Sequence, residues 1–411
     1  MRSKRFAAQT VSLAMVAAAA LAGCSVDGTA VSTADHSVDI NALDTGKYPT
    51  APRPTFGNAT ADTIGSLELS RLTDYIVAPF EIDPEVTKGI AATKPMGQGR
   101  EGIADLNIPD IVNVPANDHV LYGFNASATT PTSAIREGNR RQLDNTVLRY
   151  DTPESAAAAV KQMGDATLKD GLNAEVHPSG FPGSRVFASS GETAKDSPSL
   201  SAYTAHGGWV LYTWYGVAGK DKDLLEPALR EAISKQSALI DKFVPTPTKA
   251  EAQAKHLPEN HQEFDPHHIL VYALPGSDPT SSGTVLGARG MALYDSQSPD
   301  TLALLTKVGS TANAVDRSTV YRATTSDGAQ SIIDSKYNGA RTDGRQAVAA
   351  PPHLPDVRCY DKDAGDAFAK PSCWIHVGRY AAVVSSTDRK DLYQQAAAQY
   401  VILTKADQNA N

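Results

Sequence analysis

Two copies of one sequence pattern constrain the fold of this chain most, because a duplication predicts two domains of related architecture. In each copy an alternating strand ends in Tyr-Asp, at Tyr150-Asp151 and Tyr294-Asp295, and a proline then opens a helix. Each copy closes with an amphipathic helix. The matching segments, first copy before second, are 118–124 and 267–273, 146–156 and 289–299, 185–188 and 319–322, 208–215 and 373–384, and 223–243 and 391–405.

Each copy runs in the order strand, strand, helix, strand, strand or hairpin, and helix. This mixture predicts the α+β class: two tandem related domains, each an antiparallel sheet with helices packed on one face. We expect the first domain at residues 62–246, a Pro-rich and polar linker at 247–266, and the second domain at 267–411. An insertion at 338–372 lengthens the second copy.

The N-terminus has the pattern of a lipoprotein signal peptide. A cationic start precedes an apolar stretch at 11–22, which is too short to span a bilayer. The stretch ends in Leu21-Ala22-Gly23-Cys24, where a lipid is attached to the cysteine before cleavage. We expect residues 1–23 to be removed and Cys24 to carry the lipid; an ordinary cleavage site with an incidental cysteine is the alternative. The Ser-, Thr- and Pro-rich remainder of 24–61 is predicted to be a flexible, disordered tether.

The charge balance excludes nucleic acid as a partner. The formal net charge is −8, and it becomes −11 when the three cations of residues 1–23 are removed. Binding to nucleic acid, or electrostatic docking on anionic lipid headgroups, requires clustered cations. We therefore expect the protein to sit at the extracytoplasmic face of the cell membrane and to be held there by its lipid, since no other segment approaches a membrane-spanning length of roughly 18 apolar residues.

Two cysteines remain once Cys24 carries the lipid. Cys359 and Cys373 would lie in an oxidising compartment, where a remaining pair is most simply a disulfide. The bond would close a loop of about 15 residues and stabilise the fold by roughly 3 kcal/mol. A metal-binding or nucleophilic role is the alternative, although neither cysteine lies in a Cys-x-x-Cys context.

The aromatic segment 209–215 is the best candidate for a ligand-binding surface. Its aromatic side chains are Trp209, Tyr212, Trp214 and Tyr215. In a strand, alternation places Trp209 and Tyr215 on one face and Tyr212 and Trp214 on the other. One face is expected to be core, whereas the other either lines a groove for an apolar or sugar ligand or packs beneath a helix.

The His-rich run 255–268 lacks the spacing of known metal sites, and Pro258 and Pro266 interrupt any helix that would bring ligands together. We therefore expect a solvated linker, and we predict no metal or other cofactor. The segment Gly97-Gln98-Gly99-Arg100-Glu101-Gly102 spells G-x-G-x-x-G, but no buried strand precedes it, so a loop is expected. The cluster Arg136, Arg140 and Arg141 is either a solvated loop or a site for a phosphate or carboxylate.

Catalytic signatures are missing from the sequence. It contains neither the G-x-S-x-G motif of α/β-hydrolases nor a P-loop. Candidate acids and bases such as Asp151, Asp295 and His376 have no evident catalytic partners. Both aspartates are better explained as residues at the entry of a helix, where a negative charge is favourable.

These features together resemble uncharacterised two-domain envelope lipoproteins of mycolic-acid-containing actinobacteria. The resemblance rests on the lipobox, the Thr- and Pro-rich tether, the segment 75–84, the Tyr-Asp repeat and the Cys373-Trp374 strand. It implies a location in the cell envelope and transfers no functional residue except Cys24. The Cys-Trp strand and terminal helix are also similar to extracellular sensor domains of actinobacterial receptor kinases, which carry more cysteines.

We therefore expect a membrane-anchored, extracytoplasmic and non-enzymatic binding lipoprotein. Its ligand would be an envelope lipid, glycolipid or glycan, or a partner protein. An extracytoplasmic hydrolase with an unrecognised site is one alternative, and it would need a carboxylate or histidine pair in a deep pocket. A structural or assembly partner is the other, and it would present a large exposed apolar patch.

Overall fold

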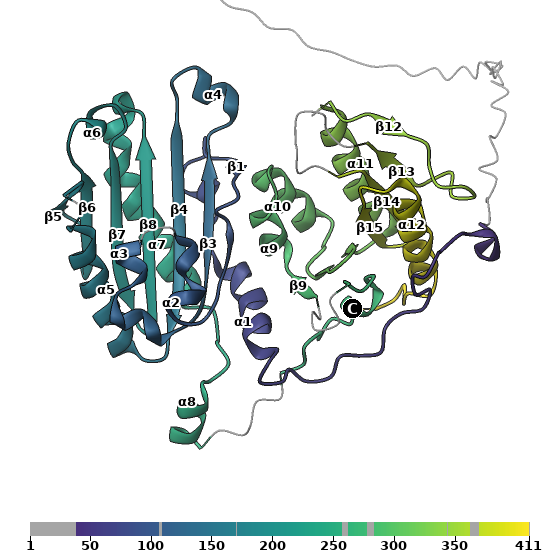
Figure 1. Ribbon diagram of the computed structural model, residues 1–411, viewed down its shortest axis with the longest axis horizontal. Helices are drawn as coiled ribbons and strands as arrows, with labels where there is room; N and C mark the ends of the chain where they lie inside the picture. Colours follow the sequence, from purple (N-terminus) through teal and green to yellow (C-terminus); the bar gives the residue numbers. More distant parts are fainter. Residues whose placement is uncertain are drawn as a thin grey trace, which may run out of the picture. The chain divides into compact units, whose positions relative to one another are not determined.

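The computed structural model describes residues 38–106, 109–169, 171–256, 262–277, 283–342, 344–361 and 370–410. The predicted signal peptide, Cys24 and the first part of the predicted tether lie outside the described residues. Two antiparallel sheets organise the described part of the chain (Figure 1). None of the helices in the described part is long and apolar enough to cross a membrane.

The first sheet has eight strands in the order β1-β3-β4-β8-β7-β6-β5, and β2 also pairs with β3. The central strand β8 is rich in β-branched and aromatic residues, which favour extended backbone. Gly207, at a positive φ of 55°, lies in the tight turn between β7 and β8. The strands are β1 (Lys88–Gly89), β2 (Lys94–Met96), β3 (Val120–Thr129), β4 (Arg141–Tyr150), β5 (Asn173–Val176), β6 (Ser184–Ser189), β7 (Ser199–His206) and β8 (Trp209–Val217).

Helices pack on both faces of this sheet. Pro153 begins α5, and the Thr152 hydroxyl caps it by accepting a hydrogen bond from the amide of Ser155 (3.1 Å). α5 packs on the side of Tyr150, and α7 packs on the opposite side. The helices of this half are α1 (Ile64–Leu72), α2 (Gly99–Gly102), α3 (Pro109–Val112), α4 (Thr132–Arg136), α5 (Pro153–Thr167), α6 (Thr193–Asp196), α7 (Leu225–Ile240) and α8 (Lys249–Ala254), with 3-10 turns at Thr73–Tyr75 (η2) and Pro79–Glu81 (η3).

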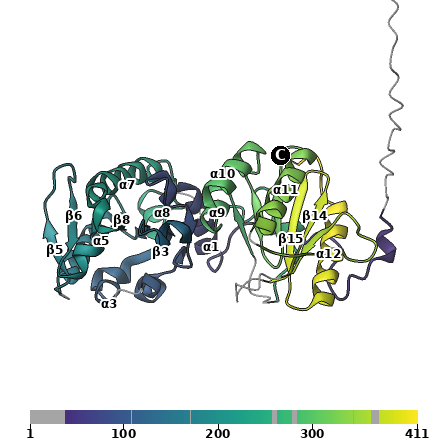
Figure 2. The ribbon, with the colours of Figure 1, turned by 90° about the horizontal axis from the view of Figure 1, so that it is seen from above.

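The second sheet has seven strands in the order β12-β13-β14-β15-β11-β10-β9. α11 packs on the face that carries Trp374, and α12 lies on the opposite face (Figure 2). The elements of this half are β9 (Thr284–Leu286), α9 (Ala288–Leu293), α10 (Ser298–Lys307), β10 (Asn313–Val315), β11 (Thr319–Arg322), α11 (Ser326–Thr342), β12 (Ala347–Val348), β13 (Arg358–Tyr360), β14 (Ser372–Val377), β15 (Tyr380–Ser385) and α12 (Arg389–Thr404).

The two sheets share one topology. When β3, β4 and α5 are matched with β10, β11 and α11, the four strands β5–β8 match β12–β15 and α7 matches α12. The strand order of the two sheets is then the same. The predicted class is confirmed: two tandem α+β domains, each with an antiparallel sheet and helices. The structure adds that helices cover both faces of each sheet (Figure 2).

The structure corrects the predicted register of the repeat. Residues 267–273 contain the 3-10 helix η7 (Leu270–Tyr272), and residues 288–293 form α9, so the prediction of strands in both places is wrong. At residues 267–273 the reason is local capping, since the buried carboxylate of Asp265 accepts hydrogen bonds from the amides of Ile269 (3.1 Å) and Leu270 (2.8 Å). At α9 the amide of Gly290 donates instead to the distant carboxylate of Asp74 (3.3 Å). A short apolar run fits a strand or a helix equally well, and such tertiary partners decide between them.

Part of the predicted tether is bound to the second domain. We call residues 39–61 the N-terminal arm. The amide of Arg53 donates to the carbonyl of Val271 (2.8 Å), and the amide of Phe264 donates to the carbonyl of Gly57 (2.9 Å). Because its backbone groups are paired in this way, the arm is an ordered segment of the fold and not a flexible coil.

Candidate functional site

The aromatic side chains of β8 lie mostly inside the first domain. Trp209 and Tyr215 are buried on the α7 side of the sheet, in two neighbouring clusters. Tyr212 is buried on the α5 side, where its ring stacks on Tyr203 with centroids 4.8 Å apart, and burial raises its pKa well above the ordinary value. This packing favours a core role for three of the four residues. Trp214 differs, because its side chain is only partly buried.

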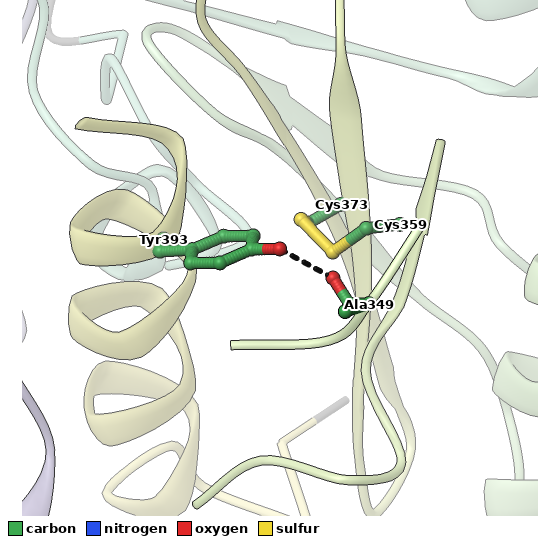
Figure 3. The surroundings of a disulfide bond; sticks show 4 residues. All are labelled: Ala349, Cys359, Cys373 and Tyr393. Atoms are coloured by element: carbon green, nitrogen blue, oxygen red, sulfur yellow. Dashed lines mark hydrogen bonds between the residues drawn. A yellow bond between two sulfur atoms is a disulfide. The ribbon is translucent and has the colours of Figure 1, made fainter. Parts of the chain in front are cut away.

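The predicted disulfide between Cys359 and Cys373 is present. The two cysteines lie directly opposite each other on β13 and β14, and both are buried. Beside the bond, the Tyr393 hydroxyl of α12 donates to the carbonyl of Ala349 (2.6 Å) (Figure 3). The disulfide and this hydrogen bond together hold the insertion of the second domain against the sheet and α12.

The glycine-rich and arginine-rich motifs have structural roles. The amide of Gly97 donates to the carbonyl of Gly102 (2.8 Å), and a Cβ on Gly102 would lie 2.1 Å from the carbonyl carbon of Gly97. The motif is therefore a closed loop in which a glycine is required. Arg141 forms ion pairs with Asp83 (3.3 Å) and Asp221 (3.2 Å), so this member of the arginine cluster is already paired within the fold.

The histidines and carboxylates singled out in the sequence do not converge. Within the described residues no three His, Cys, Asp or Glu side chains are placed to hold a metal ion. Of the His-rich run, residues 257–261 lie outside the described residues. Asp151 pairs with His119 (2.7 Å) at an exposed position. Asp295 pairs with Lys336, and its pKa is lowered by that ammonium group although burial opposes the shift.

A groove of about 660 Å³ lies between α1 and the edge of the second sheet. We call it the junction groove. One wall is a stripe of α1 formed by Ser66, Leu69, Ser70 and Thr73, which share one side of the helix because they are three or four residues apart. Phe124 of β3, Leu286 of β9 and Tyr294 add apolar surface. The remaining wall carries Asp316, Arg317 and Lys370.

Beside the groove, α9 packs tightly on the segment after α1. The Asp74 carboxylate accepts a hydrogen bond from the amide of Gly290 (3.3 Å). A Cβ on Gly287 would lie 2.0 Å from Asp74 Oδ2, and a Cβ on Gly290 would lie 2.3 Å from Thr73 Oγ1. These two glycines therefore permit the close approach. Burial raises the pKa of Asp74.

Further polar and aromatic contacts fix the same junction. The Arg289 guanidinium pairs with the Glu81 carboxylate and donates to the carbonyl of Ile76 (3.3 Å). The rings of Phe124 and Tyr294 meet edge to face, with centroids 5.6 Å apart. Burial raises the pKa of Tyr294 to about 12, so this lining phenol is neutral at physiological pH.

The N-terminal arm positions the charged wall of the groove. Arg53 pairs with the buried carboxylate of Asp316 (2.9 Å). The Arg317 guanidinium lies 5.5 Å from the ring centroid of Tyr48, and its Nε donates to the carbonyl of Pro275 (2.9 Å). Because Asp316 is paired with Arg53, the other charged groups among the described lining residues are Arg317, which also interacts with the carboxylate of Asp391, and the exposed Lys370.

This arrangement is suited to binding. The volume falls within the range of roughly 300–1,000 Å³ that is usual for small-molecule sites. Among the described lining residues there is no histidine, cysteine or glutamate, and the one aspartate is held by an arginine. No sequence motif marks the groove, although the helical spacing of Ser66, Leu69, Ser70 and Thr73 is a signal that indicates one of its walls.

Comparison with known proteins identifies a family but no activity. A family model described as the N-terminal part of a domain of unknown function, DUF7373, matches residues 55–256, and the model of the C-terminal part of DUF7373 matches residues 258–406. No curated protein matches the chain. Among solved structures, the crystal structure of the extracellular domain of PknH from Mycobacterium tuberculosis matches with 12% identity and a TM-score of 0.29, covering 45% of this chain and 98% of that chain.

Proposed function

This chain belongs to the two-domain DUF7373 family, whose function is unknown, and we propose from its own features that it is a lipid-anchored extracytoplasmic protein that binds an anionic amphiphile in the junction groove. The observation that carries the proposal is the lining of the groove. Apolar side chains and hydroxyl groups from α1, β3 and β9 face a wall whose free charge is positive. An anionic headgroup would pair with that wall, and an apolar chain would lie along the remainder.

The sign of the charge is informative because the protein as a whole is acidic. With a formal net charge of −8, the overall field of the protein disfavours the approach of an anion. Arg317 and Lys370 meet at the groove, and Arg53 removes the effect of the one acidic lining residue. The local charge is therefore opposite to the global charge where a ligand would be held.

The lipid anchor is supported by the sequence Leu21-Ala22-Gly23-Cys24 after a short apolar stretch. Two or three acyl chains on Cys24 would give stable membrane residence without a spanning helix. The variant Cys24→Ala is expected to appear in the medium or to remain as an unprocessed precursor. Membrane retention with a mass equal to that of the wild type would contradict lipid attachment at this cysteine.

A fluorescent fatty acid tests the binding site. We expect cis-parinaric acid to gain fluorescence when it is titrated into the full chain in mild detergent below its micellar concentration. Ser66→Trp places an indole in the groove from the exposed side of α1 and should weaken binding by about tenfold or more. Ser234→Trp, at an exposed position of α7, is the matched control and should bind as the wild type does. Equal binding by all three proteins would refute the groove as the site.

A second pair of measurements tests the role of charge. The double variant Arg317→Gln, Lys370→Gln should lose affinity for the fatty acid but keep its affinity for the fatty alcohol of the same chain length. That outcome would separate recognition of the headgroup from apolar contact. A parallel loss for acid and alcohol would mean that the cations do not read the headgroup. Hydrolysis of an added fatty-acid ester at this site would instead support the hydrolase alternative.

A further inference from the structure

The α5 side of the first sheet is divided into two halves of different character. α5 packs over the half that contains Leu148, Tyr150 and Tyr203, which belong to one hydrophobic cluster. α2, α3 and α5 gather at this end of the strands, and α4 and α6 lie at the other end (Figure 1). Toward that other end some polar side chains of the sheet face are buried, namely Ser127 and Ser201, whereas Asp144, Gln142 and Trp214 stay partly exposed. The partly exposed side chains of this half, Asp144, Gln142 and Trp214, are therefore the ones on this face that can meet a ligand.

The register of the strands places polar residues in two rows across this half. Ser127, Asp144, Trp214 and Ser201 are successive partners on β3, β4, β8 and β7. The next row is Thr129, Gln142, Gly216 and Ser199 on the same four strands. Partners directly opposite each other share a face, so these side chains form one surface. A single aromatic ring among hydroxyl, amide and carboxylate groups is an unusual composition for a face that would only cover a core.

We propose that this surface, which we call the platform, binds a neutral saccharide, with Trp214 as the stacking group and Asp144 and Gln142 as hydrogen-bonding groups. The proposal goes beyond binding in the junction groove and does not depend on it. Phe124, the residue of β3 that lines the groove, belongs to the cluster on the opposite face of the sheet. The two sites therefore use different faces of the first sheet.

Trp214 lies across the sheet in the manner that stacking requires. A Cβ on Gly216 would be 2.3 Å from the Trp214 ring, so the indole rests over the one position of the row that has no side chain. The indole is only partly buried and can present apolar surface to a ligand. The C–H face of a pyranose ring is itself apolar, and contact between the two would bury area at low entropic cost because the indole is already held.

Asp144 supplies acceptors for sugar hydroxyl groups. Its carboxylate accepts a hydrogen bond from the Ser127 hydroxyl and a long one from Gln142 Nε2 (3.4 Å). Each carboxylate oxygen can accept a second hydrogen bond, and the Gln142 amide can both donate and accept. In the described part of the chain no cation pairs with Asp144, and burial raises its pKa. A carboxylate in this state gains from new hydrogen-bond donors.

The same residues disfavour other classes of ligand. An anionic sugar or a phosphate would meet an uncompensated carboxylate, which costs free energy. An apolar peptide would bury Gln142 and Asp144 without partners. A quaternary ammonium ion could pair with Asp144 and stack on Trp214, but such sites usually enclose the cation in several aromatic rings, whereas this surface offers one.

The experiment is a glycan array carrying immobilised neutral and acidic oligosaccharides, followed by titration of the full chain with the best neutral ligand. Trp214→Leu keeps apolar packing but removes the ring, and it should weaken binding by about tenfold or more. Gly216→Ala keeps the ring but tilts it from the sheet, and it should have a similar effect. Protonation of Asp144 at acidic pH should weaken saccharide binding by the wild type. Asp144→Asn should weaken binding at neutral pH and should abolish this decline at acidic pH. The control Asp223→Asn, at an exposed carboxylate, should bind as the wild type does.

Three outcomes would overturn the proposal. The first is that the wild type binds no neutral glycan. The second is that Trp214→Leu and Gly216→Ala both bind as the wild type does while their circular dichroism is that of the wild type. The third is that tetramethylammonium chloride binds more tightly than the glycan and is affected by the same variants. The Ser66→Trp variant separates the two sites. It should block the fatty acid and leave the saccharide unaffected, so failure of one proposal does not imply failure of the other.

Discussion

Gly287 offers a direct test of how the junction between the two domains is built. Its backbone, with φ −72° and ψ −177°, is extended and open to any residue, so alanine would introduce no backbone strain. A Cβ would nevertheless lie 2.0 Å from Asp74 Oδ2 and 2.5 Å from its carboxyl carbon. The whole effect of Gly287→Ala is therefore a steric collision with one side chain.

The expected magnitude has two parts. Inserting a methyl group into a filled space typically costs about 1–3 kcal/mol. Moving the Asp74 carboxylate away also removes its hydrogen bond to Gly290 at the start of α9, a loss of the kind that costs about 0.5–2 kcal/mol. We therefore expect Gly287→Ala to lower the free energy of unfolding by about 2–4 kcal/mol. At about 2–4 °C per kcal/mol for a chain of this domain size, Tm should fall by about 4–16 °C.

A double-mutant cycle identifies the cause. Asp74→Ala alone should cost about 0.5–2 kcal/mol through the lost cap. The double variant Gly287→Ala, Asp74→Ala should be no less stable than Gly287→Ala alone, because the atoms that collide have been removed. Unfolding followed by calorimetry and by urea titration gives the three differences. Additive losses in the double variant would show that Asp74 is not what Gly287 accommodates, and the steric account of the junction would fail.

Three further predictions concern the arm, the disulfide and pH. Arg53→Ala leaves the buried carboxylate of Asp316 without its partner. This variant should lower the free energy of unfolding by about 1–3 kcal/mol and weaken fatty-acid binding, whereas the control Arg136→Ala, at an exposed position, should do neither. Replacing Cys359 and Cys373 together by serine should lower stability by roughly 3 kcal/mol in urea titration, and an unchanged midpoint would contradict that estimate. Because the pKa of Asp74 is raised on folding, the folded state binds its proton at a higher pH than the unfolded state does. Stability through Asp74 therefore increases as pH falls through its folded pKa, and Asp74→Asn should remove that increment from a pH series of Tm values; an identical slope in wild type and variant would disprove it.

The class of fold could be read from the sequence because it depends on patterns within single elements. The helix at α5 follows from Thr152 and Pro153 before an alanine-rich run, and β8 follows from its aromatic alternation. Both signals are local, and both were interpreted correctly. The disulfide was equally accessible, since only two cysteines remained after Cys24 and the bond needed no knowledge of the register between strands.

The register of the duplication could not be read in the same way. The sequence matched Tyr150-Asp151 with Tyr294-Asp295, but in the structure β4 corresponds to β11, so the helix after Tyr150 corresponds to α11 and not to α10. The Tyr-Asp pair at 294–295 serves a different purpose, because Tyr294 meets Phe124 and Asp295 holds Lys336. A dipeptide match carries little information when strand order, which is a property of the whole sheet, decides equivalence.

The candidate sites illustrate the same division between local and long-range information. Alternation along β8 correctly separated Trp209 and Tyr215 from Tyr212 and Trp214, yet it could not show that Tyr212 is buried whereas Trp214 stays partly exposed. That difference decides which of the two aromatic residues can meet a ligand. The surroundings of Trp214 include Asp144, which precedes it by more than 60 residues in the sequence. The two residues lie side by side only because β4 pairs with β8. A strand in which one face changes from polar to apolar residues along its length, as β4 does between Asp144 and Leu148, is the sequence signal that would direct attention to such a surface.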